Sequence, residues 1–123
     1  MTKLQTGMLI LFAGLALCPS GATAEGDVNS GEKLFARCST CHSVNGEKKM
    51  GPSLSGVVGR KAGSVAGARY SKALAQSNLV WTDETLDAYL AAPATLVPGT
   101  TMTVRIPKEQ DRLDLISYLK SLK

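Results

Sequence analysis

Two cysteines and the only histidine of the chain lie within five residues, as Cys38, Cys41 and His42. Thiols and imidazole are the side chains best suited to redox chemistry, metal binding and covalent attachment near neutral pH. Their order permits three kinds of site: a redox-active dithiol, a zinc site, or covalent attachment of haem through Cys-x-x-Cys-His.

The rest of the sequence favours the third kind of site. A thioredoxin-like dithiol requires a parallel sheet, and no apolar strand run of useful length is found. Structural zinc requires four Cys or His ligands, whereas Cys38, Cys41 and His42 are the only ones beyond the N-terminal stretch. Haem attachment uses all three, because cysteines three apart on a helical turn can each bond a vinyl group while the next imidazole reaches the iron.

The second axial position on the iron must be filled by another residue or stay open. Met50 directly precedes Gly51-Pro52, and we expect it to be an exposed or packing side chain. Met102 lies in PATLVPGTTMTVRIP, where the prolines oppose helix and favour an extended segment. Its thioether could face the iron or fill the core, and the residues alone leave both open.

The N-terminal stretch, residues 1–24, reads as a secretory signal peptide. Lys3 precedes an uncharged run from Gly7 to Cys18, and Ala22-Thr23-Ala24 offers the small residues of a cleavage site. As a helix, this run would span only about 18 Å of a hydrocarbon core about 30 Å thick. We therefore expect cleavage, no stable membrane anchor, and a single exported domain at residues 25–123 in the periplasm.

The charge of the chain is mildly basic, with a formal net charge of +4 and 5% aromatic residues. A nucleic-acid-binding protein would show a clustered basic stripe with stacking aromatics, whereas the adjacent cations are limited to Lys48-Lys49 and Arg60-Lys61. We expect no nucleic-acid partner. Steering toward an acidic protein surface is the better use of this charge.

The hydrophobic pattern predicts an all-α fold. A first helix leads into the cysteines and begins at an Asn29–Glu32 capping box or at Asp27 one turn earlier. Gly31 on this helix lets it cross the last helix closely, opposite an aromatic ring such as that of Tyr118. That crossing would hold the two ends of the domain together.

Three further helices are expected. Thr82 caps one that ends at Pro93, and the last runs from about Lys108 to Lys123, with apolar residues at i, i+3, i+4 and i+7. The glycine-rich stretch from Gly46 to Asn78 reads as loops with a short helix near Lys72 to Gln76.

Ordered segments of the chain resemble the class I cytochrome c family, above all its small bacterial and mitochondrial-type members. They are GEKLFARCSTCH, GPSLSGVVGRKAG, ARYSKAL, TLDAYLAAP, VPGTTM and DRLDLISYLKSL. The resemblance covers nearly all of residues 27–123. It implies the cytochrome c fold around one haem c, attached at Cys38 and Cys41, with His42 and Met102 as axial iron ligands.

The resemblance also assigns supporting roles around the haem. The carbonyl of Pro52 would accept the proton of the other His42 ring nitrogen, which fixes the tautomer of the ligand. Hydrogen bonds to a haem propionate would come from Arg60, Tyr70 and Trp81. Tyr89 and Thr100 would place hydroxyl groups near the axial methionine.

An iron with both axial positions filled has no free site for substrate, so the implied function is one-electron transfer without enzymatic activity. We expect a monomer that docks transiently to redox proteins, such as a membrane complex, an oxidase, a reaction centre or a periplasmic dehydrogenase. The alternative is a haem-based sensor or peroxidase-like protein that opens its distal site by releasing Met102.

Several residues depart from the family pattern. Ala94, Thr95 and Thr101 stand where mitochondrial-type members commonly carry lysines, so the rim around the haem edge is less basic. Attraction to an acidic partner would then depend on other cations. They are Arg37, Lys48, Lys49 and Lys108.

Overall fold

The computed structural model describes Gly14, Ala16 and residues 25–123. Five helices follow one another along the described chain: α1 (Val28–Phe35), α2 (Lys72–Ala75), α3 (Asp83–Ala91), α4 (Pro93–Leu96) and α5 (Glu109–Ser121). The described part has one isolated β-bridge and no strand, which confirms the all-α prediction. The predicted signal peptide falls on residues that lie outside this description, apart from Gly14 and Ala16.

Helix α1 begins at the second of the two predicted caps. The Asp27 side chain accepts a hydrogen bond of 2.6 Å from the backbone N–H of Ser30. The Asn29–Glu32 capping box is therefore wrong, because both residues already lie within the helix. A single turn continues beyond the helix, where the backbone N–H of His42 donates to the carbonyl of Cys38 at 2.9 Å.

Helix α3 begins as predicted at Thr82, whose side chain accepts from the backbone N–H of Thr85 at 3.2 Å. Pro93 follows its end but also opens α4, because a proline has no N–H to lose in the first turn of a helix. The extended segment predicted from Pro93 onward is thus wrong for its first four residues. Beyond Val97 the chain runs without regular structure to Lys108.

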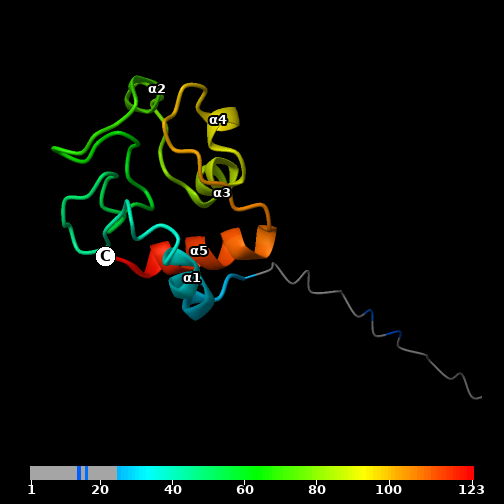
Figure 1. Cartoon of the computed structure of the whole chain (residues 1–123). Coiled ribbons are helices and arrows are strands. Elements are labelled where there is room, and N and C mark those ends of the chain that lie inside the picture. The colour runs from blue at the N-terminus through cyan, green and yellow to red at the C-terminus, as the bar shows by residue number, and fades with distance from the viewer. Residues whose placement is uncertain (1–13, 15, 17–24) are drawn as a thin grey trace, which may run out of the picture.

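Helices α1 and α5 cross with their backbones in close contact, as Figure 1 shows at the lower part of the molecule. A Cβ added to Gly31 would lie 2.0 Å from the carbonyl oxygen of Asp114 and 2.7 Å from the Cβ of Tyr118. Only glycine permits this approach, which confirms the predicted crossing. The Asp114 carboxylate, itself buried, also accepts from the backbone N–H of Asp27 at 2.8 Å.

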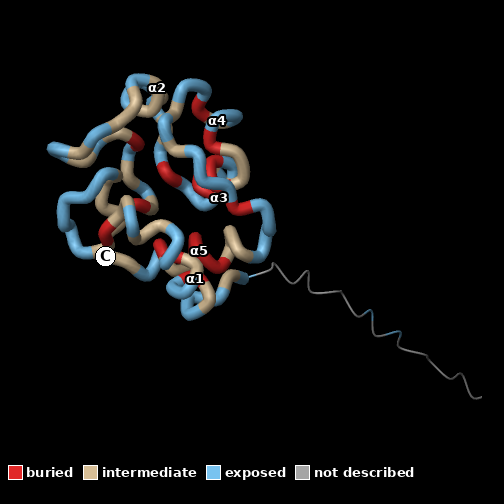
Figure 2. The backbone as a smooth tube through the Cα atoms, in the orientation of Figure 1, coloured by how far each residue is buried: buried red, intermediate tan, exposed pale blue. Residues whose placement is uncertain are grey.

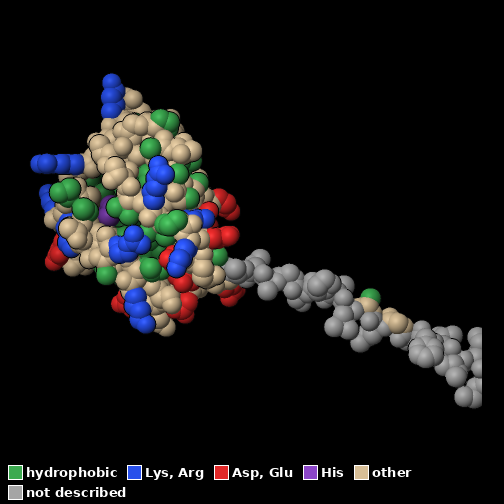
Figure 3. Space-filling model, turned by 45° about the vertical axis from the view of Figure 1, so that its right-hand side comes forward, with side chains coloured by type: hydrophobic (Ala, Val, Ile, Leu, Met, Phe, Trp, Pro, Cys, Tyr) green, Lys and Arg blue, Asp and Glu red, His purple; other side chains and the backbone are tan. Residues whose placement is uncertain are grey.

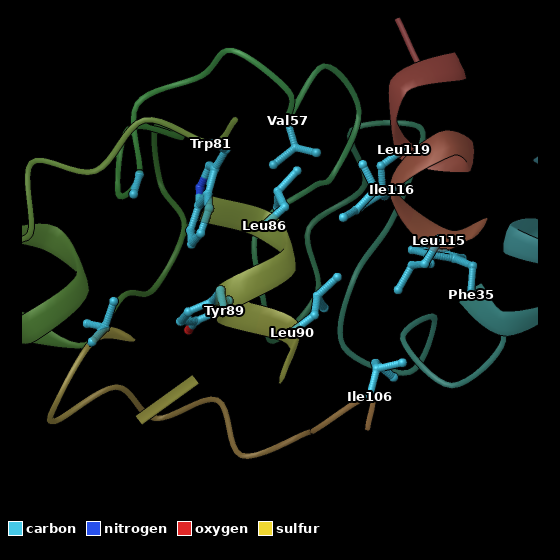
Figure 4. Packing of buried hydrophobic residues seen from close by; sticks show 12 residues of the cluster. Phe35, Val57, Trp81, Leu86, Tyr89, Leu90, Ile106, Leu115, Ile116 and Leu119 are labelled. Atoms are coloured by element: carbon cyan, nitrogen blue, oxygen red, sulfur yellow. The ribbon is translucent and has the colours of Figure 1, made fainter. Parts of the chain in front are cut away.

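The core lies between this helix pair and α3. Buried residues lie along α3 and α5 and in the loops around them (Figure 2). Leu115 and Leu119 of α5 point toward Leu86 and Leu90 of α3, with Trp81 and Tyr89 beyond them (Figure 4). Burial of each such leucine contributes about 1.5–3 kcal/mol.

The loops from residue 43 to residue 71 close the remaining side of this interior (Figure 1). The C-terminus lies against them, since the hydroxyl of Ser55 donates to the carbonyl oxygen of Lys123 at 2.9 Å. Within the residues that the structure describes, no helix has the length and apolar character needed to cross a membrane.

Candidate cofactor site

A cavity of about 390 Å³ lies between the α1–α5 pair and the α3 side of the molecule. Its volume falls within the roughly 300–1,000 Å³ typical of small-molecule and cofactor sites. Its wall is largely apolar, and none of the described residues that line it is acidic. All ten site residues predicted from the sequence line this cavity: Cys38, Cys41, His42, Pro52, Arg60, Tyr70, Trp81, Tyr89, Thr100 and Met102.

The imidazole of His42 is fixed by the backbone of the following loop. Its Nδ1 lies 2.7 Å from the carbonyl oxygen of Pro52. A carbonyl can only accept a hydrogen bond, so Nδ1 is the donor in this contact. Metal-binding histidines make the same kind of contact through the ring nitrogen that does not bind the metal, and here Nε2 is the nitrogen left for a ligand.

Gly51 also lines the cavity, although it is not among the site residues predicted from the sequence. A Cβ at this position would lie 2.6 Å from Cε1 and 2.9 Å from Nδ1 of His42. The backbone N–H of Gly51 donates to the carbonyl of Cys41 at 2.7 Å, which holds the loop against the ring. Gly51 does not have a positive φ, so the requirement for glycine here is one of space.

The two cysteines are free thiols on the cavity wall. Burial raises the pKa of Cys38, with only partial compensation from the neighbouring Arg37. A redox-active dithiol needs a lowered pKa, because the thiolate is the nucleophile. The surroundings of Cys38 therefore oppose that chemistry and leave a partly buried thiol facing an apolar cavity.

Hydrogen-bond donors gather at another part of the cavity. The guanidinium of Arg60 donates to the carbonyls of Ser53 and Ser55 at 2.8 and 3.1 Å. Burial lowers the pKa of Arg60, although the arginine stays charged near neutral pH. A positive, partly desolvated group held by neutral carbonyls is suited to an anionic group on a ligand.

Trp81 and Tyr70 add two donors beside Arg60. The backbone N–H of Trp81 donates to the carbonyl of Arg60 at 2.9 Å, which places the two residues side by side. The Tyr70 hydroxyl accepts from the backbone N–H of Val65 at 3.1 Å and keeps its own proton to donate.

The remaining predicted residues lie on the wall formed by α3 and the segment after α4. The hydroxyls of Tyr89 and Thr100 are 2.7 Å apart, and burial raises the pKa of Tyr89. Met102 is half-buried and packs against the core residues that line the cavity. Met50 is 76% exposed, in agreement with the prediction of an exposed side chain, although it too borders the cavity.

These features fit a covalently bound haem. The apolar wall suits the macrocycle, the two thiols suit its vinyl groups, and the donors around Arg60 suit its carboxylates. Together they define the class of small helical proteins with c-type haem. A family model described as "Cytochrome c" matches residues 28–123, and the chain belongs to the class I cytochrome c family.

Several relatives support this assignment. The chain is 45% identical over 114 residues to cytochrome c2 of Rhodomicrobium vannielii, covering 89% of this chain and 91% of the relative. It is 43% identical over 103 residues to the cytochrome c-type cyt cy of Rhodobacter capsulatus, covering 82% of this chain. The match spans about half of that longer relative, 52% of its length.

Solved structures give the same fold. The structure of cytochrome cH from Methylobacterium extorquens matches with a TM-score of 0.74 and 43% identity, covering 78% of this chain and 99% of the other. Ferricytochrome c2 from Rhodopseudomonas palustris matches with a TM-score of 0.74 and 38% identity, covering 79% and 99%. The fold predicted from the resemblance is confirmed.

Proposed function

We propose that this protein is a soluble periplasmic one-electron carrier with a single haem c. Cys38 and Cys41 attach the haem, and His42 and Met102 are the axial ligands. When bound, the haem supplies reversible one-electron exchange between ferric and ferrous iron. The observation that carries the proposal is the gathering of these four side chains on one apolar cavity, with Nδ1 of His42 hydrogen-bonded to the Pro52 carbonyl.

The cavity wall supports this function by excluding water. Its apolar residues lower the local dielectric constant, which disfavours the extra positive charge of the ferric state and raises the reduction potential. The donors Arg60, Tyr70 and Trp81 would stabilise a propionate that is removed from water. Pro52 holds the imidazole of His42 in one orientation, so that the ligand geometry changes little between the oxidation states.

Charge around the cavity mouth supports docking to an acidic redox partner. Arg37 and Arg69 are exposed and border the cavity, and the described lining includes no acidic side chain. Lys and Arg side chains lie over the face seen in Figure 3 together with hydrophobic groups, and most Asp and Glu side chains lie toward its margins. Such an arrangement favours weak, salt-dependent association of a monomer with its partners.

The proposal is tested on the exported, haem-loaded protein. We expect a thioether-to-iron charge-transfer band in the ferric protein, slow binding of carbon monoxide by the ferrous protein, and rapid electron exchange with membrane complexes or dehydrogenases of the periplasm. Rapid carbon monoxide binding with no such exchange would instead show a haem-based sensor or peroxidase-like protein that releases Met102.

A further inference from the structure

The segment that carries Met102 is held mainly at its two ends. Residues 101–105 form no hydrogen bond with any other described residue. On one side, Thr100 is fixed by its 2.7 Å hydrogen bond to the Tyr89 hydroxyl. The position of the Met102 thioether therefore depends on how firmly the other end is held.

That other end is anchored at Ile106 by two helices. The backbone N–H of Ile106 donates to the carbonyl of Leu90 at 2.8 Å, in the last turn of α3, where helix carbonyls lack partners within the helix. From α5, Nη1 of Arg112 donates to the carbonyls of Ile106 and Pro107, each at 3.0 Å. One guanidinium nitrogen thus binds two successive carbonyls at the end of the Met102 segment.

The guanidinium of Arg112 is in turn oriented by α3. Its Nε donates to Oδ1 of Asp87 at 2.6 Å, and the two side chains are 12% and 39% exposed. A partly buried, charge-assisted bond of this kind is stronger than a surface ion pair. Asp87 therefore fixes the donor that holds Ile106, although Asp87 itself does not line the cavity.

A second ion pair between the same two helices provides a comparison. Lys120 of α5 lies 2.8 Å from Asp83 of α3, and these side chains are 51% and 50% exposed. In the described part of the chain, neither residue forms a hydrogen bond with the Met102 segment, and neither lines the cavity. The two pairs thus join the same helices, but only the Asp87–Arg112 pair also reaches the Met102 segment.

We propose that Asp87 and Arg112 form a positioning pair that keeps Met102 in the cavity and thereby sets how readily an external ligand replaces its thioether. The proposal rests on the axial role of Met102 proposed above. In such a replacement, a sulfur–iron bond to Met102 would break and a nitrogen–iron bond to the external ligand would form, with no change in oxidation state. Loss of the carboxylate charge would free Arg112 to leave Ile106, and the segment would detach more often.

The test is imidazole binding to the ferric holoprotein, followed by the loss of the thioether-to-iron band. Asp87→Asn should bind imidazole about tenfold more tightly than the unmodified protein, as expected when a charge-assisted hydrogen bond is lost. Asp83→Asn is the matched control and should leave the affinity within about twofold. Asp87→Glu keeps the charge and should restore most of the original affinity.

The outcomes separate this proposal from the function on which it rests. Unchanged imidazole affinity in Asp87→Asn, with only a lower denaturant midpoint, would overturn the positioning role and leave a merely structural ion pair. A comparable rise in affinity for Asp83→Asn would overturn it as well. An unmodified holoprotein without the thioether-to-iron band would instead refute the axial role of Met102, and this proposal with it.

Discussion

Gly51 lies so close to the His42 imidazole that a Cβ would come within 2.6 Å of the Cε1 atom of the ring. Real Cβ atoms do not approach other atoms to this distance, so the ring or the loop would have to move. The ring is also bound to the carbonyl of the next residue, Pro52, at 2.7 Å. Gly51 and Pro52 therefore determine the orientation of the proposed iron ligand together.

We predict that Gly51→Ala moves the His42 ring away from the Pro52 carbonyl. Overpacking of this kind costs about 1–3 kcal/mol in the free energy of unfolding. The hydrogen bond that makes the imidazole a better electron donor would weaken, so the reduction potential should rise. Denaturant unfolding and equilibrium redox titration of the holoprotein measure the two effects.

Gly46→Ala is the control for this variant. Gly46 has a φ of 82° with open space around its Cβ position, so the change introduces about 1 kcal/mol of backbone strain away from His42. It should lower stability without a change in potential. Equal shifts of potential in both variants would contradict a specific role for Gly51.

The hydrogen bond between Tyr89 and Thr100 should act as a unit. Tyr89→Phe and Thr100→Val each remove one partner of the 2.7 Å contact, and each should cost about 1 kcal/mol of stability. Because either change alone already breaks the bond, the double variant should cost less than the two added together. A double-mutant cycle of denaturant unfolding measures this coupling, and strict additivity would argue that the contact contributes nothing.

The sequence was sufficient to name ten residues that line one cavity, but not to find the contacts that hold them. The Cys-x-x-Cys-His motif and the ordered family segments placed ten residues on one cavity. The close approach of Gly51 to His42 gives no local signal, because a glycine before a proline reads equally well as a turn. Gly51 does not have a positive φ, so its backbone conformation does not require glycine. Glycine is required because the His42 ring leaves no space for a Cβ.

Helix boundaries show a similar limit. Asp27 and Asn29 are both good N-caps, and the choice between them depends on contacts with α5, where the backbone N–H of Asp27 donates to Asp114. Pro93 was read as a barrier to helix, yet its position fits the first turn of α4. The Asp87–Arg112 pair was missed because its partners are 25 residues apart in sequence.

The cap at Asp27 predicts a pH-dependent contribution to stability. Hydrogen bonds from Ser30 lower the pKa of Asp27 below its ordinary value of 3.8. A lowered native pKa means that the stabilisation is complete above pH 3.8 and is lost as the pH falls through the native pKa. Asp27→Asn keeps a capping oxygen but cannot titrate. The difference in unfolding free energy between this variant and the unmodified protein should therefore shrink in acid. A difference independent of pH would contradict this assignment.

The arginines at the cavity mouth should govern the rate of electron exchange with anions. Oxidation of the ferrous protein by hexacyanoferrate(III) should slow as ionic strength rises, because salt screens the attraction. Arg37→Gln and Arg69→Gln should each slow it by about twofold at low ionic strength. Lys120→Gln, which changes a cation that does not line the cavity, is the control and should have a smaller effect. Rates that do not depend on ionic strength would contradict electrostatic steering.

The central claim is that Cys38 and Cys41 hold one haem through two thioether bonds. Intact-mass measurement of the exported protein, produced with its haem-attachment machinery and denatured before analysis, tests it most directly. Covalent attachment should give a polypeptide heavier by one haem, with no thiol on Cys38 or Cys41 available to an alkylating reagent. A colourless protein of unmodified mass, with both thiols alkylated, would contradict it.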